Sequence, residues 1–167
     1  MNDDAKKTAL RMIPYGLYVL TTRNDAGEVA AATVNWVTQT SFAPPLVVVG
    51  VKTDSGAYAM IKESGTFALN MLGKGQQGQA FTFFKPAELA DGKISGEAFS
   101  DGTTGSPILA SAIAHVECKV ASVVEQGDHH VVVGEVVGAG VAQAPEGRPD
   151  EAILTLADLG DTVFYGG

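Results

Sequence analysis

Two strand-like segments separated by a short turn place the strongest limit on how this chain folds. Residues 112–125 and 130–143 are rich in valine and alternating small residues, and Gln126-Gly127-Asp128 lies between them. A connection this short joins two strands into an antiparallel hairpin. No regular strand–helix alternation follows residue 107, so a doubly wound α/β sheet is excluded. The chain is therefore expected to be mainly β.

The rest of the sequence adds strands and only short helices. An alternating run at 17–22, the turn Asn24-Asp25-Ala26-Gly27 and a run at 28–34 predict another hairpin. Further strands are expected at 46–51, 66–72 and 152–156, helices at 5–13, 57–62 and 75–84, and a long excursion at 85–107. In the third helix, Ala80, Phe83 and Phe84 are expected to point inward. This pattern predicts a β-barrel or sandwich with helical additions.

Length and composition indicate one domain that spans residues 1–167. A chain of this length with 46% hydrophobic residues is long enough to bury a core. No apolar run approaches the roughly 20 residues of a membrane helix. The first seven residues, Met-Asn-Asp-Asp-Ala-Lys-Lys, lack the features of a secretory signal. A soluble, cytoplasmic protein is expected.

Charge and cysteine content exclude several kinds of partner and site. The net charge of −8 argues against binding to nucleic acid or to an anionic membrane, because both need a basic surface. Cys118 is the only cysteine, which rules out an internal disulfide and a cysteine-built metal site. It alternates with Val116 and Val120, so we expect a small buried hydrophobe.

The first candidate binding segment is polar and lies between two apolar runs. Thr33-Val34-Asn35-Trp36 is followed by Thr38, Gln39, Thr40 and Ser41. Backbone N–H groups and Asn35 offer donors to the carbonyl groups of a planar ring, and Val34 or Trp36 offers an apolar face. The same residues are equally compatible with a strand that faces solvent, with Trp36 filling the barrel.

A second candidate is Lys52-Thr53-Asp54-Ser55, between a buried strand and a helix. The N-terminus of a helix presents free N–H groups and positive charge, and Lys52 adds a cation. These features suit a phosphate group. Taken alone, however, the segment also reads as a plain N-cap by Ser55, and Asp54 opposes an anion unless it points away.

A third candidate is Gly127-Asp128-His129-His130 at the tip of the long hairpin. Histidines at a turn are usually exposed, but a single histidine at a barrel rim can contact a nucleotide. Adjacent strand residues face opposite ways and no third ligand follows, so no metal site is expected. The chain also lacks the dinucleotide-binding, P-loop and hydrolase-elbow motifs.

Taken together and in this order, these pieces resemble the flavin reductase-like family, whose members bind flavin in a split β-barrel. The matching residues are Tyr15-Gly16, Val19-Leu20-Thr21-Thr22, Thr33-Val34-Asn35, Thr38-Gln39-Thr40-Ser41, Pro44-Pro45-Leu46-Val47, Ser55, Phe67-Ala68-Leu69-Asn70, Ala80, Phe83, His115-Val116-Glu117-Cys118-Lys119-Val120 and Gly127-Asp128-His129. The Pro-Pro-Leu-Val step and the Gly-Asp-His hairpin are specific in combination. The resemblance implies a split β-barrel, mainly β with short helices.

The resemblance also implies roles for single residues. In that family the segment like Thr33–Ser41 lines the flavin, and the segment like Lys52–Ser55 meets its phosphate. An aromatic residue like Phe83 lies near the cofactor, and a histidine like His129 lies on the nicotinamide side in some members. The expected cofactor-binding residues are Thr33, Val34, Asn35, Trp36, Ser41, Lys52, Ser55, Phe83 and His129. No side chain is expected to act as an acid or base, and no metal is expected.

The implied activity is that of an NAD(P)H-dependent flavin reductase. Hydride would pass from NADH or NADPH to bound FMN, or FAD, and on to an acceptor. Members of the family are commonly homodimers. Where members often carry Asn, Arg, Ser and Thr, this chain has Lys52, Asp54, Ser55 and Ala57, which leaves FMN and FAD both open.

Two alternatives remain at this point. The segment Leu156–Gly167 looks more like the flavin reductase modules that work with flavodiiron proteins and rubredoxins. That likeness implies a flavin-binding electron-transfer module, reduced by a protein partner without direct use of NAD(P)H, and an electron-accepting protein as partner. The other alternative is a barrel that binds no flavin at all.

Overall fold

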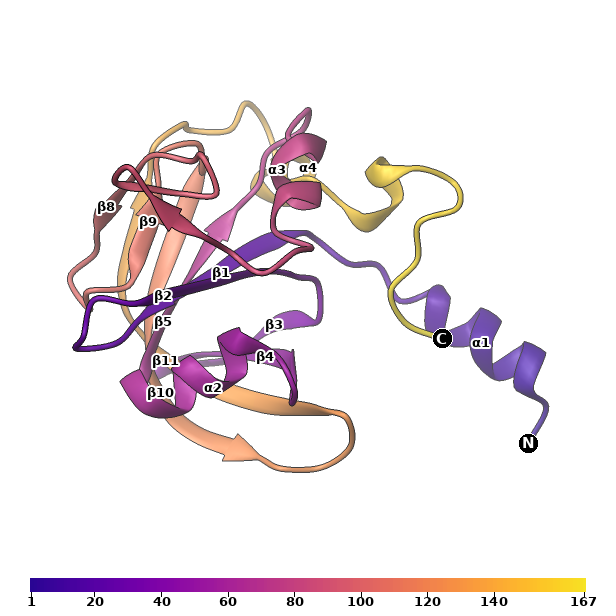
Figure 1. Ribbon diagram of the computed structural model, residues 1–167. Helices are drawn as coiled ribbons and strands as arrows, with labels where there is room; N and C mark the ends of the chain where they lie inside the picture. Colours follow the sequence, from indigo (N-terminus) through magenta and orange to yellow (C-terminus); the bar gives the residue numbers. More distant parts are fainter.

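A seven-stranded antiparallel sheet forms the centre of the computed structural model, which describes residues 1–167 (Figure 1). Its strand order is β2-β1-β5-β10-β11-β4-β3, and every pairing is antiparallel. The strands are β1 (Tyr18–Arg23), β2 (Val29–Val34), β3 (Val37–Phe42), β4 (Pro45–Lys52), β5 (Thr66–Met71), β10 (Ala114–Val124) and β11 (His129–Val141). The expectation of a mainly β fold is confirmed.

The two edge strands of this sheet are joined by only two residues, and that connection curls the sheet into a barrel. β2 ends at Val34 and β3 begins at Val37, so Asn35 and Trp36 connect opposite edges. In a flat sheet those edges would lie roughly 30 Å apart, far beyond the reach of two residues. The backbone of Trp36 is fixed to β4, because the Gly50 N–H donates to its carbonyl at 2.9 Å. No strand pairing links β2 to β4, and the barrel is split there.

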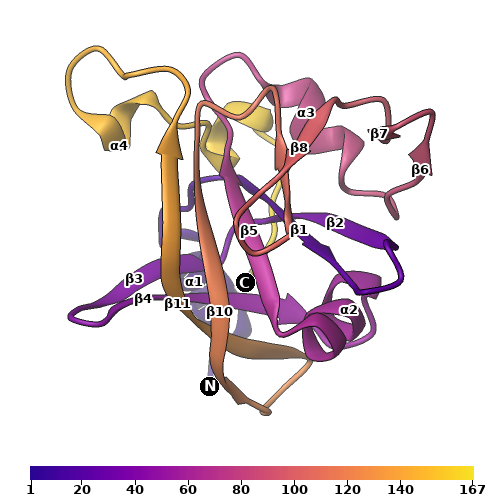
Figure 2. The same cartoon turned by 90° about the vertical axis from the view of Figure 1, so that its left-hand side faces the viewer.

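The long β10–β11 hairpin forms one side of the barrel and crosses from one half to the other. β10 pairs with β5 and β11 with β4, so the hairpin bridges both halves (Figure 2). Register shifts occur at Glu117/Cys118 and at Val120/Ser122. Irregularities of this kind bend a strand and increase its twist, which allows the hairpin to wrap around the core.

Helix α2 (Gly56–Ser64) closes one end of the barrel. Its beginning and end follow the expected signals: the Ser55 side chain accepts from the Tyr58 N–H, and Gly65 adopts φ 69°. The helix buries Ala57, Tyr58 and Ile61 against the barrel core. The Tyr58 hydroxyl lies 2.5 Å from Nδ1 of His130, which ties the helix to the tip of the long hairpin.

A second core lies outside the barrel under the remaining short elements. These are α3 (Gln77–Thr82), β6 (Leu89–Ala90), β7 (Lys93–Ile94), β8 (Phe99–Asp101), β9 (Pro107–Leu109), α4 (Pro149–Ala152) and the 3₁₀-helix η1 (Leu156–Leu159). Their buried side chains include Phe83, Ile94, Leu109 and Leu154. Helix α1 (Asp3–Arg11) buries no residue and projects from the body of the protein (Figure 1). None of the helices has the length and apolar content to cross a membrane.

Most expected elements are present, with two corrections. The strand expected at 152–156 is wrong: Ile153 and Thr155 form only isolated bridges, between α4 and η1. Phe84 does not point inward with Phe83, because α3 ends at Thr82 and leaves Phe84 52% exposed. The excursion at 85–107 is confirmed as irregular chain with short strands that pack on the second core.

A buried carboxylate, Glu117 on β10, anchors the loop between β8 and β9. Glu117 is 4% exposed, and its carboxylate accepts from the backbone N–H and the hydroxyl of Thr104 at 2.8 and 2.9 Å. Gly102 leaves no room for a side chain beside that carboxylate. Burial works against ionisation, but the hydrogen bonds from the 103–104 segment outweigh it and lower the pKa of Glu117. The ionised Glu117 carboxylate thus holds the β8–β9 loop in place by accepting its hydrogen bonds.

We predict that Glu117→Gln lowers the free energy of unfolding by about 1–3 kcal/mol at pH 7, because a buried acceptor of two donors is weakened. A lowered folded-state pKa stabilises the protein above the ordinary pKa of a glutamate, and that stability is lost as pH falls through the folded value. Urea unfolding from pH 7 to pH 3 should therefore show a smaller acid-induced loss in the variant.

Glu135→Gln is the matched control, since Glu135 is exposed on the neighbouring strand and has no side-chain partner. Equal unfolding curves for Glu117→Gln and Glu135→Gln would contradict this role for Glu117.

Candidate functional site

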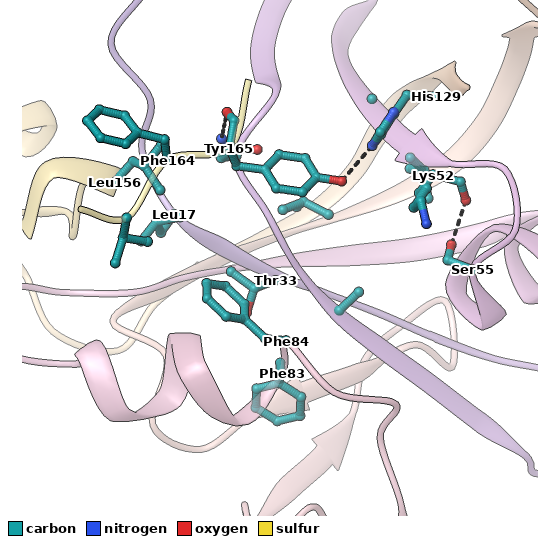
Figure 3. A pocket seen from close by; sticks show the side chains of 16 residues that line it. Leu17, Thr33, Lys52, Ser55, Phe83, Phe84, His129, Leu156, Phe164 and Tyr165 are labelled. Carbon is teal, nitrogen blue, oxygen red and sulfur yellow. Dashed lines mark hydrogen bonds between the residues drawn. The ribbon is translucent and has the colours of Figure 1, made fainter. Parts of the chain in front are cut away.

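A pocket lies along the open seam of the barrel, where β2 and β4 are not paired (Figure 3). It has a volume of about 360 Å³ and is bounded by β2, β4, α3, the start of β11 and the segment after η1. Its lining residues are Leu17, Ala32, Thr33, Val34, Asn35, Gly50, Val51, Lys52, Ser55, Phe83, Phe84, His129, Leu156, Val163, Phe164 and Tyr165. Most of this wall is apolar, with a few polar groups, as is typical of small-molecule sites.

Seven of the nine residues expected from the sequence line this pocket: Thr33, Val34, Asn35, Lys52, Ser55, Phe83 and His129. Trp36 and Ser41 do not line it. Trp36 lies behind the wall, where its ring packs on His129 and Tyr165 with centroids 4.6 and 5.4 Å apart. Ser41 lies on β3, which leads away from the seam toward an exposed hairpin. The expected segment therefore divides at the turn between β2 and β3.

One end of the pocket is polar and is formed by the N-terminus of α2. Lys52 and Ser55 both line it there, on the right of Figure 3. The Ser55 hydroxyl donates to the Lys52 carbonyl at 2.7 Å while it caps the helix. The Lys52 ammonium is paired with the Asp54 carboxylate at 3.1 Å, and this hydrogen bond and charge raise the pKa of Lys52. Asp54 does not line the pocket. The arrangement suits an anion, with Asp54 as a competing charge.

The polar groups on β2 are already engaged within the protein. The Thr33 N–H donates to the Phe83 carbonyl at 3.0 Å, and the Thr33 hydroxyl donates to the Ala80 carbonyl at 2.7 Å. Thr33 therefore fixes the end of α3 and sets the position of the Phe83 wall. The Asn35 amide donates to the Tyr165 carbonyl at 3.3 Å.

A chain of hydrogen bonds runs from the hairpin tip into the pocket. His129 Nδ1 lies 2.9 Å from an Asp128 carboxylate oxygen, and His129 Nε2 lies 2.6 Å from the Tyr165 hydroxyl. The hydrogen bond and charge of His129 lower the pKa of Asp128. An ionised carboxylate only accepts, so in the neutral imidazole Nδ1 carries the proton and Nε2 accepts from Tyr165. Burial raises the pKa of Tyr165, which keeps its hydroxyl protonated as that donor.

Sequence reasoning missed the aromatic residues that follow η1. Val163, Phe164 and Tyr165 line the pocket together with Leu17 and Leu156. The only available signal was the Phe-Tyr pair itself, in a segment with no regular periodicity. Cys118 is fully buried, and burial raises the pKa of its thiol to about 12, so the expectation of a small buried hydrophobe is confirmed. No group of three His, Cys, Asp or Glu side chains is arranged to hold a metal ion.

The family model of the flavin reductase like domain matches residues 10–160, which include the three barrel hairpins and most of the pocket wall. This chain belongs to that family. The match confirms the resemblance seen in the sequence.

Among curated proteins, this flavin reductase-like domain is 33% identical over 141 residues to a flavin reductase (NADH) of Kitasatospora aureofaciens. The match covers 84% of this chain and 73% of that protein. It is 35% identical over 146 residues to diflavin flavoprotein A 1 of Synechocystis sp., covering 86% of this chain. The chain spans only 25% of that longer protein.

Among solved structures, the domain is similar to an NADH:FAD oxidoreductase of Streptomyces globisporus in complex with NAD and FAD fragments. The TM-score is 0.67 at 31% identity, and the match covers 77% of this chain and 76% of that one. The fold is thus that of flavin reductase-like proteins.

We predict that Ser55→Ala lowers the free energy of unfolding by about 1 kcal/mol, because α2 loses its N-cap. Ser55→Asp should keep the stability of the original chain, since aspartate is an equally good N-cap and its charge favours the helix N-terminus. Thermal or urea unfolding of both variants tests this. Equal destabilisation by the two substitutions would show that the hydroxyl acts through the Lys52 carbonyl rather than through the cap.

Proposed function

We propose that this protein is an NAD(P)H-dependent flavin reductase that holds FMN in the seam pocket. The observation that carries the proposal is the pairing, within one pocket, of an apolar slot and a cationic helix N-terminus. A flavin nucleotide has the same two parts, a flat apolar ring system and an anionic phosphate. Membership of the flavin reductase like domain family supports the same activity.

The residues present fit the ring of a flavin. Val34, Val51 and Phe83 supply apolar surface from three different elements. Gly50 lets the chain pass close to Trp36, since a Cβ there would lie 3.1 Å from the indole. A cavity of about 360 Å³ lies within the range of roughly 300–1,000 Å³ for small-molecule sites. The apolar wall would exclude water from the face of the ring.

The α2 N-terminus fits the phosphate. Its free backbone N–H groups and the Lys52 ammonium lie at one end of the pocket, beside the Ser55 cap. The single phosphate of FMN matches this one cationic corner, which is why we propose FMN rather than FAD. NADH or NADPH would supply the reducing equivalents.

The chain's own residues bind and orient, and none of them needs to act as an acid or base. Bound flavin would supply the hydride-accepting chemistry. Lys52 and α2 would hold the anionic end, while Thr33 keeps Phe83 against the ring slot through its bonds to α3. Asp128 fixes the tautomer and orientation of His129, on the side proposed for the nicotinamide. Positioning two rings in this way lowers the entropy cost of the transfer.

A second candidate function is a flavin-binding electron-transfer module that a protein partner reduces. The similarity to diflavin flavoprotein A 1 favours this second function. The match covers only 25% of that protein, so the matching segment there is one part of a longer chain. In either case an electron-accepting protein is a proposed partner.

We also propose that the protein is a homodimer. Support comes from large apolar side chains that are exposed on β11 and on the neighbouring β3–β4 hairpin: Phe42, Val131, Val137 and Val141. Burial of such side chains against a second copy would remove them from water.

The function is tested first by the visible absorbance of the purified protein with added FMN. We expect flavin absorbance that bleaches under anaerobic conditions when NADH or NADPH is added, and recovers with air. Bleaching by one nucleotide identifies the donor. Bound flavin that stays oxidised with both nucleotides would favour the electron-transfer module, and absence of flavin binding would contradict both functions.

The phosphate seat is tested by comparing FMN with riboflavin, which lacks the phosphate. We predict that Asp54→Asn tightens FMN binding several-fold, because it frees Lys52 and removes a competing charge. Ser55→Asp should weaken FMN binding about tenfold or more, because it places a charge against the phosphate while keeping the helix cap. Neither change should alter riboflavin binding. Equal effects on the two ligands in fluorescence titrations would argue against this seat.

A further inference from the structure

We propose that residues 161–167, which we call the strap, compete with the nucleotide ligand for the seam pocket, and that Tyr165 must leave His129 before the ligand binds. This inference deepens the proposed function and rests on it. It assigns to Tyr165 a role that controls access to the site.

The strap engages the polar groups that a ligand in this pocket would use. The Tyr165 hydroxyl donates to Nε2 of His129 at 2.6 Å, and the Tyr165 carbonyl accepts from the Asn35 amide at 3.3 Å. The Tyr165 ring also packs against His129 and Trp36, with centroids 5.7 and 5.4 Å apart. In Figure 3 its side chain reaches across the pocket toward His129. A ring placed beside His129 therefore excludes Tyr165 from that position.

The strap is also a thin partition between two cavities. The seam pocket and a second cavity of about 310 Å³ share four lining residues, Leu156, Val163, Phe164 and Tyr165. On its far side the second cavity is bounded by Arg11, Ile13, Pro14 and Tyr15. Movement of the strap would join the two spaces into one groove. Such a groove would have a larger volume than the seam pocket alone.

Few interactions hold the strap in place. The backbone N–H groups of Phe164–Gly167 donate no hydrogen bond to other backbone groups. Phe164 and Tyr165 are 50% and 47% exposed. Arg11 stacks on the Phe164 ring at 4.2 Å and donates to the Gly166 carbonyl at 3.3 Å. Segments with exposed side chains and few backbone bonds open at low free-energy cost.

The strap leaves one buried donor without a partner. Trp36 Nε1 is inaccessible to solvent and makes no hydrogen bond. Gly166 covers that edge of the indole, since a Cβ at Gly166 would lie 3.6 Å from Nε1. A buried donor without a partner destabilises the arrangement that buries it. Release of the strap would expose the Trp36 N–H to solvent or to an acceptor on the ligand. The new hydrogen bond would offset part of the free energy lost when Tyr165 leaves His129.

The test uses Tyr165→Ala and Tyr165→Phe in the full chain, with FMN as the probe. Trp36 is the only tryptophan, so its quenching by acrylamide reports opening of the strap without any ligand or turnover. We expect quenching to increase at least twofold in Tyr165→Ala and less in Tyr165→Phe, which loses only the hydroxyl. Leu89→Ala is the control, since Leu89 is exposed on β6, lines neither cavity and lies outside the proposed dimer surface.

Stopped-flow mixing with FMN gives the second readout. The observed rate in the original chain and in Leu89→Ala should reach a plateau with FMN concentration, because strap opening limits binding. In Tyr165→Ala the rate should rise linearly and the affinity increase about three- to tenfold. Tighter binding with a lost plateau supports the strap even if NAD(P)H is never oxidised, an outcome that would contradict only the reductase.

The opposite results overturn the inference. Weaker FMN binding by Tyr165→Ala would make Tyr165 a ligand contact, and unchanged kinetics with unchanged Trp36 quenching would make the segment a fixed wall. Failure of every variant to bind FMN would overturn the strap and the proposed cofactor together.

Discussion

The two-residue connection through Asn35 and Trp36 is the constraint on which the rest of this structure depends. It links the outermost strands of a seven-stranded sheet, so the sheet has to curl until β2 and β3 nearly meet. Curling brings β2 beside β4 without pairing them, and the unpaired line between these strands becomes the floor of the pocket. The site is therefore a consequence of how the barrel closes. It is not an addition made by loops on a finished scaffold.

The same closure explains why the pocket has one apolar and one charged end. β4 leads directly into α2 through Lys52 and Ser55, so the helix N-terminus lies where the seam ends. Pairing of β11 with β4 in the register His129↔Lys52 then places the hairpin tip at the same end. In a protein with a net charge of −8, this local cluster of N–H groups and one lysine is what makes an anion acceptable.

Local signals in the sequence predicted the fold well because they act over a few residues. Ser55 and Gly65 mark the ends of α2, and the turn at Gly127 marks the long hairpin. Lys52 and Ser55 were predicted as a site for the same reason, since both belong to one strand–helix junction. The resemblance assigns the whole segment Thr33–Ser41 to the flavin, but the turn between β2 and β3 separates its two halves, and of its two ends only Thr33 lines the pocket. Sequence distance is a poor guide across such a turn.

Residues of the strap could not be predicted because their positions depend on tertiary contacts alone. Tyr165 is fixed by His129 and Asn35, which come from the hairpin tip and the barrel connection, and Phe164 by Arg11 from α1. No periodicity or cap marks such a segment. The contrast with Thr33 is informative: its hydroxyl and N–H are both committed to α3, so that wall of the pocket is rigid. One wall of this site is held by the hydrogen bonds of Thr33 to the end of α3. The other wall is the strap, which is held only by contacts with a few side chains. The site is therefore expected to open on the side of the strap.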